Sequence, residues 1–136
     1  MPIWIYLVIA FLVFDVVLVL VIVVRRKSVR KFRAEEAQYI KSHWIRIIDS
    51  FHNDPKNAVM DADKILDYAL LRRGFEGSLG EKLKKAGPRF SDLNGVWSAH
   101  KLRNRIAHEM GNISKDEAKK ALGGFKRGLN DLGAGL

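Results

Sequence analysis

The stretch Arg103-Asn104-Arg105-Ile106-Ala107-His108 combines side chains that can act on a phosphodiester bond. Arg103 can grip a phosphate with two parallel hydrogen bonds and neutralise charge on its oxygens. His108 can move a proton near neutral pH, a role that contributes about 10²–10⁴-fold to a rate. Asn104 can orient either partner by hydrogen bonds. Arg103, Asn104 and His108 are therefore candidate catalytic residues for metal-independent RNA cleavage, in which attack by the ribose 2′-OH leaves a 2′,3′-cyclic phosphate.

Residues four apart share one face of a helix, so a helix here places His100, Asn104 and His108 in one polar row. Arg103 lies on the flank of that row. Lys101 and Arg105 add positive charge nearby. We expect His100, Lys101 and Arg105 to contribute to RNA binding around the candidate catalytic residues.

The stretch from Leu102 to Glu109 resembles the Arg-polar-x-x-x-His signature of the HEPN superfamily of small helical bundles. The resemblance extends over about residues 36–133, but its specific part is those eight residues. It implies an all-α bundle and, in many members, RNA cleavage at a site to which both subunits of a homodimer contribute the motif. Other members bind nucleotides or RNA, or only dimerise, without cutting.

Each candidate residue also has a structural interpretation. His108, as a cation in the last turn of a helix, would interact with the helix dipole, typically by about 0.3–1 kcal/mol. Arg103 could form a salt bridge with a neighbouring helix, and Asn104 could hold the loop that follows. His100 fits a surface histidine better than a second catalytic residue.

The N-terminal run from Ile3 to Val24 is apolar except for Asp15. As a helix it would be about 33 Å long, enough to cross a hydrocarbon core of roughly 30 Å. Trp4 and Tyr6 suit the membrane interface. A cleaved signal peptide fits less well, because no basic residue precedes the run and no Ala-x-Ala site follows it. We therefore predict a single transmembrane helix.

A basic collar follows this run within residues 25–33, and we expect it to contact anionic lipid head groups. Basic residues beside a span stay cytoplasmic, which predicts an outside N-terminus and a cytoplasmic domain. The predicted organisation is an anchor with its collar over residues 1–33 and a helical domain over residues 34–136. The collar residues are Arg25, Arg26, Lys27, Arg30, Lys31 and Arg33.

Asp15 lies near the predicted bilayer midplane, where an acid costs at least about 2.5–3.5 kcal/mol on insertion scales. One interpretation is a lone protonated acid that a very apolar helix tolerates. The other is a contact with a neighbouring helix, either in an oligomer of this chain or in another membrane protein.

The composition of the chain limits the kinds of functional site that it can form. Of the formal net charge of +9, residues 34–136 carry only +4, from 18 Lys and Arg against 14 Asp and Glu, so the domain is mildly basic. The chain has no cysteine, which excludes disulfides, thiol catalysis and zinc sites built from cysteine. There is no P-loop motif and no metalloprotease pattern. We expect no cofactor.

Apolar residues at helical spacing and capping residues predict an up-and-down bundle of four to five helices, with no strand. Without Gly or Pro between Ile3 and Asp54, the membrane helix could continue into the first of them. Helices are expected over about 55–73, from Ser78 to near Gly87, over about 92–110 with Ser91 as cap, and after Ser114. The predicted core faces are Ile40, Trp44, Ile47, Ile48 and Phe51; Ala58, Ala62, Ile65, Leu66, Ala69 and Leu70; Val96, Ala99, Leu102, Ile106 and Met110; and Ala118, Ala121, Leu122, Phe125, Leu129 and Leu132.

Three functions compete on this basis. The first is a membrane-anchored, metal-independent endoribonuclease. The second is a non-catalytic, membrane-anchored module that binds a partner, a nucleotide or RNA. The third is a small subunit of a membrane complex that docks through Asp15. The Arg103, Asn104 and His108 motif favours the first, whereas Asp15 and the small domain favour the others.

Overall fold

A computed structural model describes residues 1–27 and 32–136, without the side chains of 25–27. In these ranges the chain is all-helical, with six α-helices, one short 3₁₀ helix and no strand. The chain divides into two compact units, Met1–Arg30 and Lys31–Leu136. The predicted collar is largely outside this description: Arg30 and Lys31 are not among the described residues, and of Arg25, Arg26 and Lys27 only the helical backbone is described.

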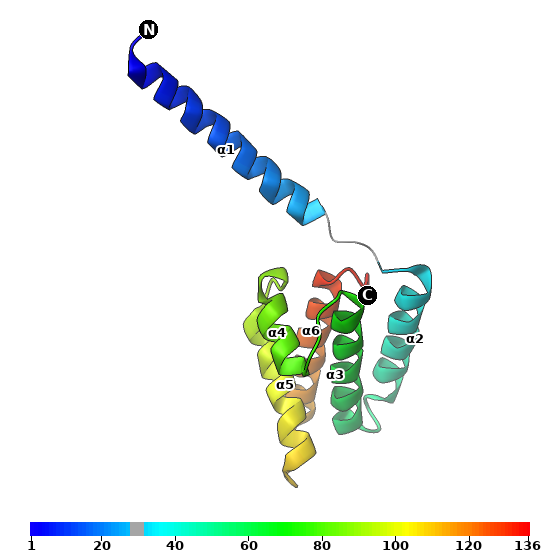
Figure 1. The fold of residues 1–136 in the computed structure, drawn as a ribbon. Coiled ribbons are helices and arrows are strands. Elements are labelled where there is room, and N and C mark those ends of the chain that lie inside the picture. The colour runs from blue at the N-terminus through cyan, green and yellow to red at the C-terminus, as the bar shows by residue number, and fades with distance from the viewer. Residues whose placement is uncertain (28–31) are drawn as a thin grey trace. The chain divides into compact units, whose positions relative to one another are not determined.

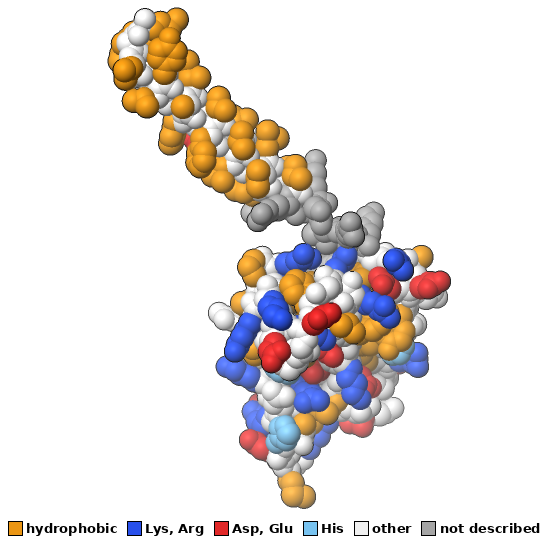
Figure 2. All heavy atoms as spheres, in the orientation of Figure 1, with side chains coloured by type: hydrophobic (Ala, Val, Ile, Leu, Met, Phe, Trp, Pro, Cys, Tyr) orange, Lys and Arg blue, Asp and Glu red, His pale blue; other side chains and the backbone are white. Residues whose placement is uncertain are grey.

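The first unit contains α1 (Ile3–Lys27), a helix long and apolar enough to span a membrane. Its segment Ile3–Val24 has a mean hydropathy of 3.4. Hydrophobic side chains cover the visible face of this helix (Figure 2). Asp15 is exposed in the middle of the segment. By length and composition alone, a signal sequence near an N-terminus has the same properties.

The second unit is a bundle of five α-helices (Figure 1). Helix α3 packs against α2, α4, α5 and α6, and α5 packs along α6. Short connections reverse the chain between α2 and α3 and between α5 and α6. The elements are α2 (Ala34–Ser50), α3 (Pro55–Arg72), α4 (Leu79–Ala86), the 3₁₀ helix η1 (Gly87–Arg89), α5 (Leu93–His108) and α6 (Lys115–Asp131).

Capping side chains mark where several helices begin. The side chains of Asp54 and Ser78 accept from Asn57 N–H and Glu81 N–H at the starts of α3 and α4. At Ser114 a complete capping box opens α6, as predicted. Such side chains satisfy N–H groups that have no partner within the helix.

The predicted core faces of α3 and α6 are confirmed in full, since every residue named for them is buried. Leu83, Ala86 and Phe90, from α4 and the segment after it, complete the same core. Leu102 and Ile106 of α5 are only partly buried but pack against it. The core therefore lies around α3, with the other four helices of the bundle as its walls.

Four expectations were wrong. Ile48 is 47% exposed, because α2 packs on α3 along one narrow stripe. Met110 is fully exposed, because α5 ends at His108. Asp92, rather than Ser91, caps α5 by accepting from Gly95 N–H, while Ser91 bonds to Asp131. Finally, α1 and α2 are separate helices, since residues 32 and 33 between them are not helical.

The segment before α2 is fixed to the far end of the chain through Arg73. The guanidinium of Arg73 lies 3.9 Å from the centre of the Phe32 ring and donates hydrogen bonds to the Leu132 carbonyl oxygen. Burial lowers the pKa of Arg73 from its ordinary value, with the nearby Arg89 adding to the effect and Glu36 opposing it. Phe32 is buried as a result. The bundle thus begins at Phe32, two residues before its first helix.

Close contact between α5 and α6 depends on a missing side chain at Gly124. A Cβ atom there would lie 2.8 Å from the Gly95 carbonyl oxygen, closer than van der Waals contact allows. A Cβ atom at the neighbouring Gly123 would meet no atom within 4 Å. Gly124 therefore allows the close approach of α5 and α6, whereas Gly123 lies in open space.

This pair provides a matched test of the helix contact. Gly124→Ala should lower the melting temperature of the bundle, because α5 and α6 must separate; overpacking of this kind costs about 1–3 kcal/mol. Gly123→Ala should raise it, because alanine is about 1 kcal/mol more favourable than glycine in an open helical position. Thermal unfolding of the full chain in detergent micelles, followed by circular dichroism, would measure both. Equal shifts in the two variants would contradict the close approach.

Candidate functional site

A buried carboxylate on α3, Asp63, holds the side of α5 that carries the motif. Its side chain is 7% exposed. Asp63 Oδ1 accepts a hydrogen bond from Nδ1 of His100 at 2.8 Å, and Asp63 Oδ2 lies 3.3 Å from Nε of Arg103. The structural interpretation of Arg103, a salt bridge to a neighbouring helix, is therefore confirmed.

Two further hydrogen bonds join these residues into what we call the Asp63 network, made of Asp63, His100, Arg103 and Asn104. Nη1 of Arg103 donates to Asn104 Oδ1 at 3.2 Å. Nδ2 of Asn104 lies 3.4 Å from His100 Nε2. The carboxylate, the imidazole, the amide and the guanidinium thus form a closed ring of contacts between α3 and α5.

The ring of contacts fixes the orientation of each group. A guanidinium only donates, so Arg103 turns the oxygen of the Asn104 amide toward itself and leaves its nitrogen facing His100. That nitrogen only donates, and the Asp63 carboxylate only accepts. His100 therefore turns Nδ1 toward the Asp63 carboxylate and Nε2 toward the Asn104 amide nitrogen.

His100 does not lie in an outward row with Asn104 and His108. Its side chain is 12% exposed and is directed at α3. The interpretation of His100 as a surface histidine was wrong, because the helix turns it toward Asp63 rather than toward solvent. Nε of Arg103 is also buried; it pairs with Asp63 by distance but lacks hydrogen-bond geometry, so the pair is electrostatic rather than a directed bond.

His108 lies apart from the Asp63 network. It is the last residue of α5 and is exposed. No contact joins it to Arg103 among the described residues, and five residues along a helix place the two side chains about 140° apart around the axis. Contacts within one chain therefore join Arg103, Asn104 and His100, whereas among the described residues no hydrogen bond or ion pair links His108 to them.

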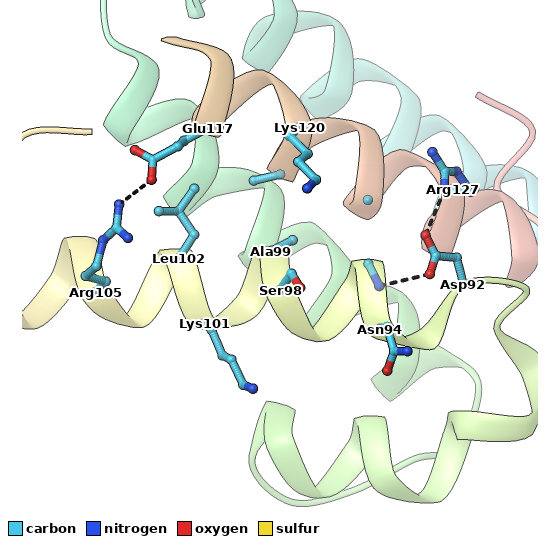
Figure 3. A pocket seen from close by; sticks show the side chains of 13 residues that line it. Asp92, Asn94, Ser98, Ala99, Lys101, Leu102, Arg105, Glu117, Lys120 and Arg127 are labelled. Carbon is cyan, nitrogen blue, oxygen red and sulfur yellow. Dashed lines mark hydrogen bonds and ion pairs between the residues drawn. The ribbon is translucent and has the colours of Figure 1, made fainter. Parts of the chain in front are cut away.

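The other two candidate RNA-binding residues, Lys101 and Arg105, line an open groove between α5 and α6 of about 670 Å³ (Figure 3). Arg105 bonds to Glu117 of α6 at 2.9 Å. That hydrogen bond, followed by one from the Ser114 backbone, lowers the pKa of the Glu117 carboxyl. The groove is lined by Asp92, Asn94, Gly95, Ser98, Ala99, Lys101, Leu102, Arg105, Glu117, Lys120, Ala121, Gly124 and Arg127.

Asp63 and the α6 side of the groove were missed by sequence reasoning. Asp63 did carry a signal, because it lies three residues before Leu66 and four after Val59, both buried on α3. A carboxylate on the buried face of a helix needs a partner. Lys120 and Arg127 carried no such signal, since any exposed helix face has similar charges.

Within the described residues no group of three His, Asp or Glu side chains is arranged to hold a metal ion. Arg33, the one collar residue whose side chain the structure describes, is exposed and lies directly before α2, where its backbone N–H donates to the Glu36 carboxylate. Comparison with protein-family models, with curated proteins and with solved structures gives no match to this chain.

Proposed function

We propose that this chain is a membrane-anchored, HEPN-like protein that cleaves single-stranded RNA without a metal, as a homodimer. The observation that carries the proposal is the Asp63 network, which holds Arg103 and Asn104 of the motif in fixed positions on α5. A site on fixed side chains needs no rearrangement when charge develops in the transition state. A single strand is favoured because in-line attack by the 2′-OH needs a flexible backbone.

In this proposal each motif residue has a role. Arg103, whose side chain is 29% exposed, presents its outer amino groups to the phosphate while Asp63 holds its Nε side. Asn104 fixes the angle of the guanidinium through the 3.2 Å hydrogen bond. His108, exposed at the end of α5, takes the 2′-OH proton or protonates the leaving oxygen.

The homodimer is part of the proposal because Arg103 and His108 diverge around α5. A two-fold axis beside α5 would set His108 of one subunit against Arg103 of the other, and a symmetric interface would do this twice. Two composite sites would then form from two incomplete ones.

The alternative function is a non-catalytic module that binds RNA or a nucleotide. One observation favours it: the Arg103 guanidinium already has a counter-charge, Asp63, in its own bundle. A paired guanidinium attracts a phosphate less strongly than a free one.

RNA cleavage decides between the two functions. The full chain in detergent micelles would be incubated with labelled single-stranded RNA in the presence of a chelator, and the products examined for 2′,3′-cyclic phosphate ends. Such ends support the endoribonuclease. Intact RNA over a broad panel of sequences at high protein concentration, together with retained binding, supports the module.

The proposal also places α1 across a lipid bilayer, with the bundle in the cytoplasm. The apolar length of Ile3–Val24 supports the span, and the basic residues after it support the orientation. Protease added to intact cells should therefore leave the bundle undigested, and detergent lysis should expose it. Digestion of the bundle before lysis would contradict the orientation. Secretion of a shortened chain would identify α1 as a signal sequence.

Asp15 should strengthen association between helices in the membrane. An unpaired acid near mid-membrane is costly, so contact with a second α1 or with another membrane protein should lower that cost. Asp15→Leu should give a lower yield of cross-linked oligomer or partner complex than the unmodified chain. Asp15→Asn, which keeps a hydrogen-bonding group, should retain most of the yield. An unchanged yield in Asp15→Leu, with normal insertion, would show that the acid is merely tolerated.

A further inference from the structure

Lys120 of α6 lies in the groove between two arginines that are each tied to a carboxylate (Figure 3). Arg105 pairs with Glu117 at one end of the groove, and Arg127 pairs with Asp92 at 2.8 Å at the other. Among the described residues Lys120 has no ion-pair partner. Both carboxylates of the groove are thus paired with arginines. The remaining positive charge of the groove comes from its lysines.

The groove has an apolar floor beneath these charges. Ala99 and Ala121 are buried, Leu102 is half-buried, and Gly124 allows the close approach of the two helices. Lys101 lies across α5 from this floor and points away from α6 (Figure 3). A ligand that fits must therefore carry negative charge for Lys120 together with flat or apolar groups for the floor.

We infer that the groove between α5 and α6 binds a single RNA strand, with Lys120 as its central phosphate contact. The choice of RNA as the ligand rests on the function proposed above. The assignment of the groove as a binding site rests on its charged side chains and its apolar floor. Glu117 and Arg127 are ten residues apart, or about 15 Å along the helix, a length that roughly four stacked nucleotides would occupy. Bases or riboses cover the floor while phosphates face Lys120.

The groove also leads toward the motif. Arg105 and His108 are three residues apart on α5, so they share one side of that helix. A strand that passes Arg105 therefore continues to His108 at the end of the helix. The strand that the groove binds is in this way delivered to the proposed general acid or base.

Binding of a non-cleavable strand tests the inference separately from cleavage. A fluorescein-labelled 2′-O-methyl oligouridylate lacks the attacking hydroxyl, and its anisotropy reports binding to the full chain in detergent micelles. Lys120→Glu should raise Kd about tenfold and lower the slope of log K against log salt concentration by about one, as expected for one lost phosphate contact. Lys120→Ala should act in the same direction with a smaller change.

Lys119→Glu is the matched control, because it makes the same charge change at an exposed neighbour on α6 that does not line the groove. It should alter Kd by less than about threefold. Equal effects at the two positions would overturn the groove assignment. If 5′-AMP displaced the oligonucleotide at a concentration comparable to that of the oligonucleotide, the groove would be a mononucleotide pocket. That result would overturn the inference that it binds an RNA strand. Selective loss of binding in Lys120→Glu supports the groove even where the unmodified chain cuts no RNA.

Discussion

His108→Ala should lower the rate of RNA cleavage at least about 10²-fold, the lower end of the effect for a lost general acid or base. The exposed imidazole at the end of α5 is the group placed to move a proton, because both ring nitrogens of His100 face other side chains, Asp63 and Asn104. Binding of the strand should change little, since His108 acts on the proton of the 2′-OH rather than on the phosphates. Cleavage under single-turnover conditions in a chelator would measure the rate.

His52→Ala is the control for this experiment, because His52 is also exposed but lies on the connection between α2 and α3 and is not a motif residue. It should cut RNA at the unmodified rate. Arg103→Ala should also reduce cleavage, and Asn104→Ala should do so to a smaller extent. Full activity in His108→Ala would remove this residue from the mechanism. Unfolding of His108→Ala would instead support its role in stabilising the end of α5.

Asp63→Asn should destabilise the bundle more than any other single charge removal discussed above. The substitution removes the counter-charge of Arg103 and replaces one of the two carboxylate oxygens by a donating amide nitrogen, so His100 and Arg103 can no longer both face an acceptor at the contact between α3 and α5. Loss of one partner from such a buried arrangement costs about 2–3 kcal/mol. At roughly 4 °C per kcal/mol for a domain of this size, the melting temperature should fall by about 10 °C.

Asp61→Asn is the matched control on the same helix. Its side chain is 40% exposed and pairs only with neighbours on α3. Exposed pairs of this kind contribute about 0–1 kcal/mol, so the melting temperature should change by only a few degrees. If Asp63→Asn melted like Asp61→Asn, the Asp63 network would not be a stabilising element.

Much of the bundle could be predicted from the sequence, because caps and helical spacing are local signals. Ser114 and the apolar stripe of α6 sufficed to place that helix and its buried face. The end of α5 could not be placed in this way, since Met110 continues the apolar spacing beyond the residue at which the helix stops. Likewise, Ile48 fits the spacing of α2 but lies outside its contact with α3.

The candidate site was less predictable because it depends on contacts between helices. A helical face placed His100, Asn104 and His108 in one row, whereas Asp63, 37 residues earlier than His100, draws His100 out of it. Spacing along one helix cannot reveal such a partner. It also cannot reveal that Gly124 allows α6 to approach Gly95 closely, on which the shape of the groove depends.

The Asp63 network has a further consequence for how α3 and α5 align. Apolar packing between two helices is non-directional, so it specifies their alignment less sharply than a directed polar contact does. A slide of one turn, about 5.4 Å, would separate Asp63 from both His100 and Arg103. The carboxylate therefore makes one alignment of α3 and α5 lower in free energy than its neighbours. This contact keeps the motif at one position along α3.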